Sequence, residues 1–172
     1  MNIETDRLII RPFEEADLLE FEKLLDIKEV PGWVMQKDRS REFLAWHISN
    51  YRNMDIINGI VCLGIFDKIK GCVLGAVGVG EHDDLHEVEI YYNLLENARG
   101  YGYATEAAKA VTEWAFRTYN IPHLIGTAAS DNIPSQRVLE RCGYKFIDEQ
   151  KLLVHITNKT YIFKYYRCYS TI

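Results

Sequence analysis

The residues best suited to chemistry form a glycine-rich stretch that reads Arg99-Gly100-Tyr101-Gly102-Tyr103-Ala104-Thr105. An extended run leads into it and an amphipathic helix leaves it. The first amides of a helix lack intrahelical acceptors and lie at the positive end of its dipole, so they can hold a phosphate or pyrophosphate. Gly100 and Gly102 allow positive φ and a close approach of ligand to backbone. The alternative is an ordinary strand–helix connection in which the glycines serve tight packing.

Two common phosphate-binding motifs do not fit this stretch. The dinucleotide pattern G-x-G-x-x-G fails because Thr105 stands at the third glycine position, and no Gly-Lys-Ser/Thr follows as a P-loop requires. The pattern present is R-x-x-G-x-A, from Arg99 to Ala104, directly after the extended run 87–95.

A carboxylate stands in the middle of that extended run. Strand alternation puts Val88, Ile90, Tyr92 and Leu94 on one face and Glu89 on the other. A carboxylate among β-branched and aromatic residues is costly unless it is paired or used. Glu89 is therefore a candidate general base, with pairing to a neighbouring basic group as the alternative.

A second motif follows one strand later. It begins Asn132-Ile133-Pro134-Ser135, continues as a short helix, and closes with Gly143-Tyr144. In combination with R-x-x-G-x-A, this N-x-x-S motif resembles the GNAT superfamily, the GCN5-related N-acetyltransferases. The opening segment from Glu4 to Phe13 is similar to the branch that includes the RimJ and RimL ribosomal-protein N-acetyltransferases.

The resemblance spans nearly the whole chain and implies a single GNAT domain over residues 1–172. The implied fold is of the α/β class. It has a twisted sheet of about seven strands, mostly antiparallel and partly parallel, flanked by about four helices.

The resemblance also implies how acetyl-CoA is held. Leu94 and Leu95 offer backbone groups to the pantetheine arm, and Asn132 bonds the pantetheine amide. The pyrophosphate contacts the loop whose members are Arg99, Gly100, Tyr101, Gly102, Tyr103, Ala104 and Thr105.

For catalysis, the resemblance implies Glu89 as the base and Ser135 close to the thioester sulfur. An amine must be neutral to attack a thioester, so a carboxylate or an ordered water must take its proton. The chain departs from the family at three positions. Leu139 replaces a tyrosine acid, Asn93 replaces a tryptophan, and Tyr91 replaces a glycine and adds bulk near the acceptor.

The remaining elements must position these residues. The pattern predicts a strand over 5–12, a helix over 13–25 interrupted by Pro31-Gly32, and a second helix that Ser40 caps. It also predicts a hairpin of two apolar strands covered on both faces, 60–66 and 72–79, a strand over 123–129, and extended segments at 144–147, 152–156 and 160–167. On the helix after the loop, Glu106, Lys109, Glu113 and Arg117 form an outer face with oppositely charged pairs three or four residues apart.

The histidines near these elements have ordinary interpretations. His47 lies on an apolar helix stripe and is predicted to be packed. His82 and His86 belong to a polar loop, and an exposed acidic turn is favoured there over a metal site. No metal is expected.

Composition limits the partners and the location. The 172 residues carry a net charge of −5, which disfavours a nucleic-acid surface and mildly favours a cationic acceptor. Acidic residues gather before the thioester site at Glu81, Asp83, Asp84, Glu87 and Glu89. Charged residues near the start argue against a signal peptide, and no apolar run is long enough for a membrane span. We expect a cytoplasmic monomer or homodimer.

Two functions remain open at this point. The first is an N-acetyltransferase in which a primary amine, on a protein N-terminus or a small molecule, attacks acetyl-CoA directly in a ternary complex. The second is a catalytically inactive CoA-binding regulatory or interaction module with the same fold. The sequence does not identify the acceptor.

Overall fold

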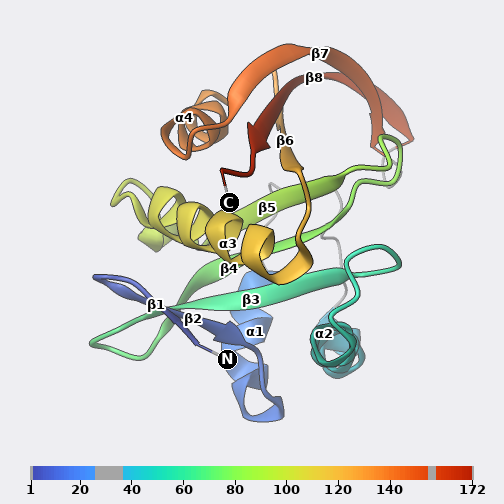
Figure 1. Cartoon of the computed structure of the whole chain (residues 1–172). Helices are drawn as coiled ribbons and strands as arrows, with labels where there is room; N and C mark the ends of the chain where they lie inside the picture. The colour runs from blue at the N-terminus through green and yellow to red at the C-terminus, as the bar shows by residue number, and fades with distance from the viewer. Residues whose placement is uncertain (1, 26–36, 155–157, 172) are drawn as a thin grey trace.

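In the computed structural model, which describes residues 2–25, 37–154 and 158–171, the strands form one eight-stranded sheet in the order β1-β2-β3-β4-β5-β6-β8-β7 (Figure 1). The strands are β1 (Ile3–Glu4), β2 (Leu8–Pro12), β3 (Ile60–Asp67), β4 (Val73–Glu81), β5 (Val88–Leu94), β6 (His123–Ala129), β7 (Lys145–Val154) and β8 (Lys159–Tyr169). The α-helices are α1 (Leu18–Leu25), α2 (Ser40–Asn53), α3 (Tyr103–Tyr119) and α4 (Ile133–Arg141). Single 3₁₀ turns occupy η1 (Glu15–Asp17), η2 (Lys37–Arg39) and η3 (Glu96–Ala98).

The sheet is antiparallel except where β5 runs parallel to β6. This confirms the predicted mixed α/β fold. The eighth strand arises because the chain start folds back as β1, where Ile3 lies opposite Ile10 of β2. The predicted segments 144–147 and 152–154 join into the single strand β7, and residues 155–156 lie outside the described part of the chain.

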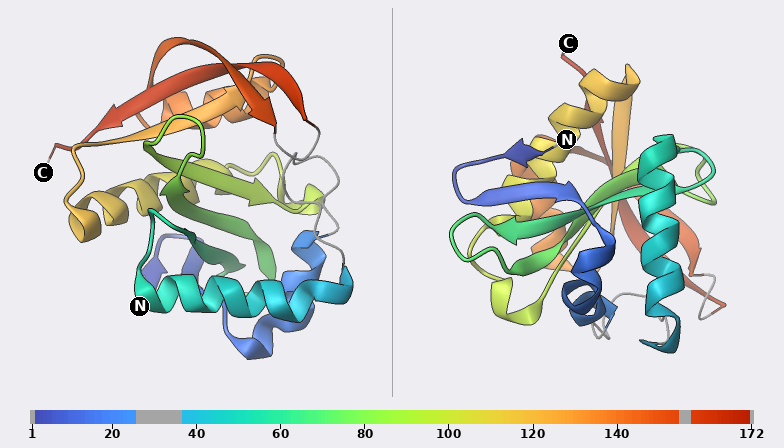
Figure 2. Two further views of the ribbon diagram at one scale, coloured as in Figure 1. Left: turned by 90° about the vertical axis from the view of Figure 1, so that its right-hand side faces the viewer. Right: turned by 90° about the horizontal axis from the view of Figure 1, so that it is seen from below.

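Helices cover both faces of the central strands (Figures 1 and 2). On one face, the predicted apolar side of α3 is buried against β4 and β5, with Ala107, Val111 and Ala115 fully enclosed. On the other face, α1 and α2 bury an aromatic cluster that includes Phe13 and Phe21. Because both faces are covered, β3 and β4 are continuous apolar runs, as predicted.

The sheet divides at the parallel pair. Between β5 and β6 the register is held where Glu89 lies opposite Ile125. From there β6 turns away from β5 together with β8, β7 and α4, which form the upper part of the molecule in Figure 1. Beyond this point β5 and β6 are no longer paired, which leaves a gap between them along the part of β5 that leads to the glycine-rich loop.

Two details of the first helices differ from the sequence prediction. The helix predicted from Phe13 begins as the turn η1, where the Asp17 carboxylate accepts the Glu14 amide at 2.8 Å and pairs with Arg11 at 2.7 Å. Ser40 does not cap α2. Ser40 is the first residue of α2, the N-cap position belongs to Arg39, and the Ser40 hydroxyl donates to Glu22 of α1 at 2.7 Å. The predicted interruption at Pro31-Gly32 lies outside the described residues.

His47 is packed, as predicted. Its ring lies 4.4 Å from that of Phe43 and 5.7 Å from that of Phe21, measured between centroids. Burial lowers the pKa of His47 to about 4, so this side chain is neutral at physiological pH.

Candidate active site

The glycine-rich loop connects β5 to α3 through η3. Gly100 has φ +85° and Gly102 has φ +83°, both in the left-handed region that favours glycine. Gly102 is the residue that precedes the first turn of α3, so the unbonded amides of that turn begin at this point. The structure therefore has the predicted strand–loop–helix geometry of an anion site, and its contact with a pyrophosphate stays a prediction.

Leu94 and Leu95 differ in what their backbones can offer a ligand. The Leu95 amide donates to Leu74 of β4, and the Leu95 carbonyl accepts from Ala98, both at 2.9 Å. Backbone groups alternate in direction along a strand, so the amide and carbonyl of Leu94 point away from β4, toward the gap beside β6. Arg99 reaches back to the Leu94 carbonyl at 3.2 Å. Leu94 is thus the better of the two predicted pantetheine contacts.

A cavity of about 570 Å³ lies between β5 and β6. Its walls include Glu89 and Tyr92 from β5, Thr127 from β6, and Ser135 from α4. Phe163 of β8 contributes to an aromatic side of the same cavity. Both predicted catalytic residues therefore face one space.

Glu89 occupies the place where the β5–β6 ladder ends. One oxygen, Oε1, accepts two hydrogen bonds from Thr127, one from its amide and one from its hydroxyl, both at 2.7 Å. The carboxylate thus serves as the partner that the Thr127 amide would otherwise find in a longer ladder. Burial raises the pKa of Glu89, and the nearby His82 and the Thr127 hydrogen bonds offset this only in part.

Ser135 has a partner that the N-x-x-S motif does not indicate. The Tyr92 hydroxyl lies 2.9 Å from Ser135 Oγ and donates to the Ser135 carbonyl at 3.0 Å. Burial raises the pKa of Tyr92, so its hydroxyl stays protonated. Strand alternation had placed Tyr92 on the apolar face, but only the position of α4 shows that its hydroxyl meets Ser135.

Asn132 is the N-cap of α4, and its Oδ1 accepts the Ser135 amide at 3.2 Å. This bond uses the carbonyl oxygen of the Asn132 side chain. Nδ2 is the atom that can donate to a ligand carbonyl. A hydrogen bond from Nδ2 to the carbonyl of a pantetheine amide stays a prediction.

The Tyr91 ring packs over a glycine of the neighbouring strand β4. Gly78 lies opposite Tyr91 in the β4–β5 register, and a Cβ at residue 78 would lie 2.2 Å from the Tyr91 hydroxyl oxygen. A glycine at position 78 therefore provides the space that the tyrosine at position 91 fills. The ring packs with the aromatic cluster under α1 and α2 and also lines the cavity.

Two of the acidic residues that precede or begin β5, Glu81 and Glu87, have basic partners. Glu87 contacts His123 at 2.6 Å and Arg167 at 2.7 Å, and accepts the Tyr165 hydroxyl at 2.7 Å. Burial opposes ionisation of Glu87, but these hydrogen bonds and the Arg167 charge lower its pKa overall. Glu81 pairs with His86 at 3.1 Å. The negative charge of Glu87 is thus compensated locally by Arg167.

Comparison with known proteins identifies the family. The sequence model of the acetyltransferase (GNAT) domain matches residues 7–145, which is most of the chain. The chain belongs to the GNAT acetyltransferase family. It is therefore an acyltransferase of this family, which confirms the enzyme class predicted from the motifs.

Individual relatives agree with this assignment. The chain is 28% identical over 149 residues to the uncharacterized N-acetyltransferase YnaD of Bacillus subtilis (strain 168), covering 84% of this chain and 83% of that protein. Its fold matches the RimL ribosomal L7/L12 α-N-protein acetyltransferase, solved with coenzyme A, at TM-score 0.81 and 16% identity over 98% of each chain. It also matches the microcin C7 self-immunity acetyltransferase MccE, solved with acetyl-CoA and AMP, at TM-score 0.80 and 18% identity, covering 96% of this GNAT chain and 94% of that one.

Within the described ranges, none of the helices has the length and apolar character needed to cross a membrane.

Proposed function

We propose that this GNAT enzyme transfers the acetyl group of acetyl-CoA to a primary amine, in the manner of the RimJ/RimL-like branch. One observation carries the proposal. A single cavity contains a half-buried carboxylate, Glu89, and a hydroxyl pair, Tyr92 and Ser135, beside the strand that leads into the glycine-rich loop. These are the groups needed to take a proton from an amine and to assist a leaving thiolate.

The donor is held along β5 and the start of α3. The pyrophosphate is bound by the amides of residues 100–104, and the pantetheine arm lies in the gap between β5 and β6 beside Leu94 and Asn132. Dipoles and amides at a helix start favour an anion without a protein side chain. Structural relatives bind coenzyme A or acetyl-CoA, which supports this choice of donor.

Transfer occurs in one ternary complex. The neutral amine nitrogen attacks the thioester carbon, and its proton passes to the Glu89 carboxylate directly or through a water. The tetrahedral oxyanion is stabilised by a backbone donor near Leu94. When the carbon–sulfur bond breaks, the Ser135 hydroxyl donates a hydrogen bond to the departing thiolate, and the acetyl group leaves as the amide of the acceptor. The thiolate takes a proton from solvent to form CoA, and Glu89 returns the amine proton to solvent.

The acceptor is a cationic amine on a protein N-terminus or a small molecule. Asp83 and Asp84 are exposed in the β4–β5 turn and give the approach a negative field, while Glu81 and Glu87 are paired. The aromatic side of the cavity, which includes Tyr161 and Phe163, suits an apolar group next to the amine.

The test is release of free thiol from acetyl-CoA across a panel of amines, peptides with free N-termini included. We expect turnover with at least one cationic primary amine and none with the corresponding tertiary amine. Calorimetry with CoA is the companion measurement. Binding of CoA without turnover on any acceptor would favour the inactive module, and absence of CoA binding would overturn the proposed donor.

A further inference from the structure

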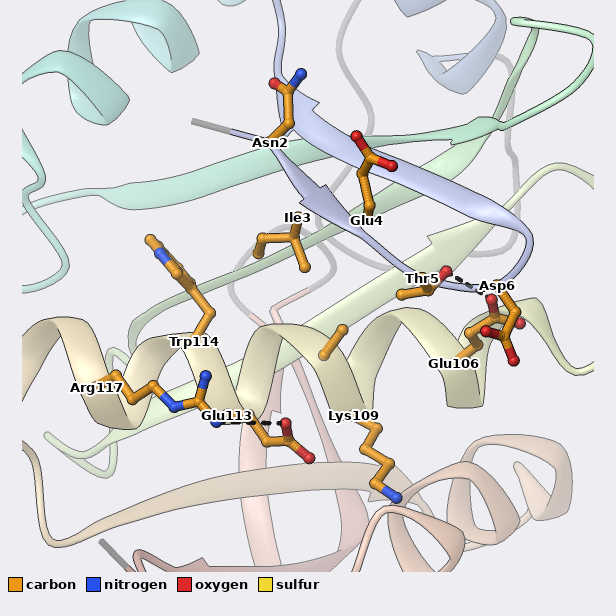
Figure 3. A pocket seen from close by; sticks show the side chains of 11 residues that line it. Asn2, Ile3, Glu4, Thr5, Asp6, Glu106, Lys109, Glu113, Trp114 and Arg117 are labelled. Carbon is orange, nitrogen blue, oxygen red and sulfur yellow. Dashed lines mark hydrogen bonds and ion pairs between the residues drawn. The ribbon is translucent and has the colours of Figure 1, made fainter.

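The opening segment of the chain contacts the first turn of α3. Arg7, which precedes β2, donates from its amide to Glu106 Oε1 at 3.0 Å and from Nε to Glu106 Oε2 at 2.7 Å. The Thr5 hydroxyl donates to the same Glu106 Oε1 at 2.6 Å. Figure 3 shows Thr5 and Glu106 meeting at one end of the pocket between β1 and α3. Residues about 100 positions apart are thereby joined beside the glycine-rich loop.

Arg7 also holds the loop itself. Its Nη1 donates to the Tyr101 carbonyl at 2.9 Å, and its guanidinium lies over the Tyr103 ring, 4.6 Å from the centroid. A peptide unit is planar and trans, so its carbonyl and the following amide point in opposite directions. By fixing the Tyr101 carbonyl on the Arg7 side, this bond turns the Gly102 amide to the other side. Because Gly102 can adopt positive or negative φ, the peptide between Tyr101 and Gly102 could face either way, and the Arg7 hydrogen bond holds it in one orientation.

Arg7 further compensates a charge that would oppose an anion. Glu106 stands in the first turn of α3, where a carboxylate stabilises the helix but repels a phosphate bound at the same helix start. Burial opposes its ionisation, but the hydrogen bonds from Thr5 and Arg7 lower the pKa of Glu106 overall, so the carboxylate is charged. The Arg7 guanidinium, 2.6 Å away, neutralises it.

We propose that Arg7 is a positioning residue for the donor, which orients the Tyr101–Gly102 peptide for pyrophosphate binding and neutralises Glu106 behind the loop. This inference rests on the proposed function, because it assumes that the loop holds the pyrophosphate of acetyl-CoA. The opening segment, whose sequence resembles the RimJ and RimL branch, thereby has a physical role in donor binding.

The test compares two acetyl donors. Acetyl-CoA carries the pyrophosphate, and S-acetylpantetheine has the same thioester and pantetheine arm without it. Arg7→Met keeps an unbranched apolar stem and removes the charge and the donors. We expect KM for acetyl-CoA to rise roughly 10- to 100-fold, the range for losing charged hydrogen bonds. We expect kcat to change little, and kcat/KM for S-acetylpantetheine to stay at the wild-type value.

Arg11→Met is the matched control. Arg11 lies in β2, pairs with a carboxylate at 2.7 Å and covers an aromatic ring at 4.0 Å, but these partners are Asp17 of η1 and Phe66 of β3 and not the glycine-rich loop. We expect it to lower thermal stability without changing the preference between donors. Arg7→Lys keeps the charge but not the forked donors, so we expect it to restore part of the acetyl-CoA affinity.

Two results would overturn the inference. The first is an equal loss with both donors in Arg7→Met, which would mean that Arg7 supports only the fold. The second is an unchanged KM for acetyl-CoA. If Arg7→Met does not fold, the same donor comparison on Arg7→Lys decides, and an unchanged donor preference there overturns the inference. If no acceptor supports turnover, calorimetry with CoA on wild type, Arg7→Met and Arg11→Met tests the inference separately from the proposed reaction.

Discussion

Replacement of Glu89 by glutamine separates its chemical role from its structural one. Both Thr127 hydrogen bonds end on Oε1 of Glu89, and a glutamine can present its amide oxygen at the same place. The gap between β5 and β6 therefore keeps its geometry in Glu89→Gln. What the substitution removes is the negative charge and with it the capacity to take a proton.

The size of the expected loss follows from that difference. Removing a general base costs roughly 10²- to 10⁴-fold in rate, which is about 3 to 5 kcal/mol in activation free energy. The loss should appear in kcat, with acetyl-CoA affinity nearly unchanged, because in the proposed mechanism Glu89 acts on the acceptor amine and not on the donor. It should also shrink at high pH, where free amine is abundant. Steady-state rates between pH 6 and pH 9, with CoA binding by calorimetry, measure both effects.

Glu89→Gln should lower activity but not the stability of the fold. Burial raises the folded pKa of Glu89, so between the unfolded and folded pKa values the folded state binds more protons than the unfolded state. Wild-type stability therefore falls as pH rises through this interval. Glu89→Gln removes that dependence, and we expect it to be at least as stable as wild type at pH 8 in thermal unfolding.

Glu89→Ala provides the contrast. It removes the acceptor of the Thr127 amide as well as the base, so we expect it to lose about 1 to 3 kcal/mol of stability in addition to activity. A folded Glu89→Gln enzyme within about threefold of wild-type kcat at pH 7 would refute the reasoning. Glu89 would then serve only as the latch on Thr127, with water as the base.

Three further outcomes are expected. Tyr92→Phe should lower kcat as Ser135→Ala does, with the double variant no worse than either single one and no recovery at high pH, because the two hydroxyls act together after attack; steady-state rates of the three variants measure this. Gly102→Asp should abolish acetyl-CoA binding in calorimetry while the protein stays folded, because a side chain and a negative charge would stand where the pyrophosphate binds, and φ +83° disfavours a side chain there. Glu87→Gln should destabilise the protein at pH 7 and not at low pH, because the pKa of Glu87 is lowered and its contribution is lost as pH falls through that value; denaturant unfolding at several pH values, with kcat near wild type, checks it.

Local patterns predicted the elements but not their long-range partners. The apolar spacing of α3, the hairpin of β3 and β4, and the turn at Gly102 all depend on neighbours within a few residues, and the structure contains each of them. Ser40 failed as a predicted cap because its hydroxyl bonds Glu22, which lies 18 positions away. The sequence pattern at Ser40 gives no signal for that contact.

The site shows the same division. The alternation of side chains along β5 identified Glu89 as unusual, because it shows a carboxylate in the middle of a strand of apolar and aromatic residues, and this needs only neighbouring positions in the sequence. Its partner Thr127 lies 38 positions away on β6, and only the register of the parallel pair brings them together. The Tyr92–Ser135 contact likewise depends on how α4 lies against β5. A family resemblance could supply Ser135, but not the tyrosine that stands beside it in this chain.

Glu106 shows why helix spacing alone misleads about charge. The spacing rule pairs Glu106 with Lys109, a contact that on an exposed helix contributes only about 0.2 to 0.5 kcal/mol. Its partner in the structure is Arg7, which makes a forked contact, and Glu106 is largely enclosed with 18% of its side chain exposed. Arg7 meets both carboxylate oxygens, Oε1 through its backbone amide and Oε2 through its guanidinium, and Thr5 also donates to Oε1. A single lysine on the same helix cannot satisfy both oxygens in this way. The spacing rule does hold for Glu113 and Arg117, which lie 4.0 Å apart on the solvent-facing part of the same helix. Charge spacing thus identifies partners only where no other segment covers the helix, and the chain start covers α3 at the turn where the glycine-rich loop ends.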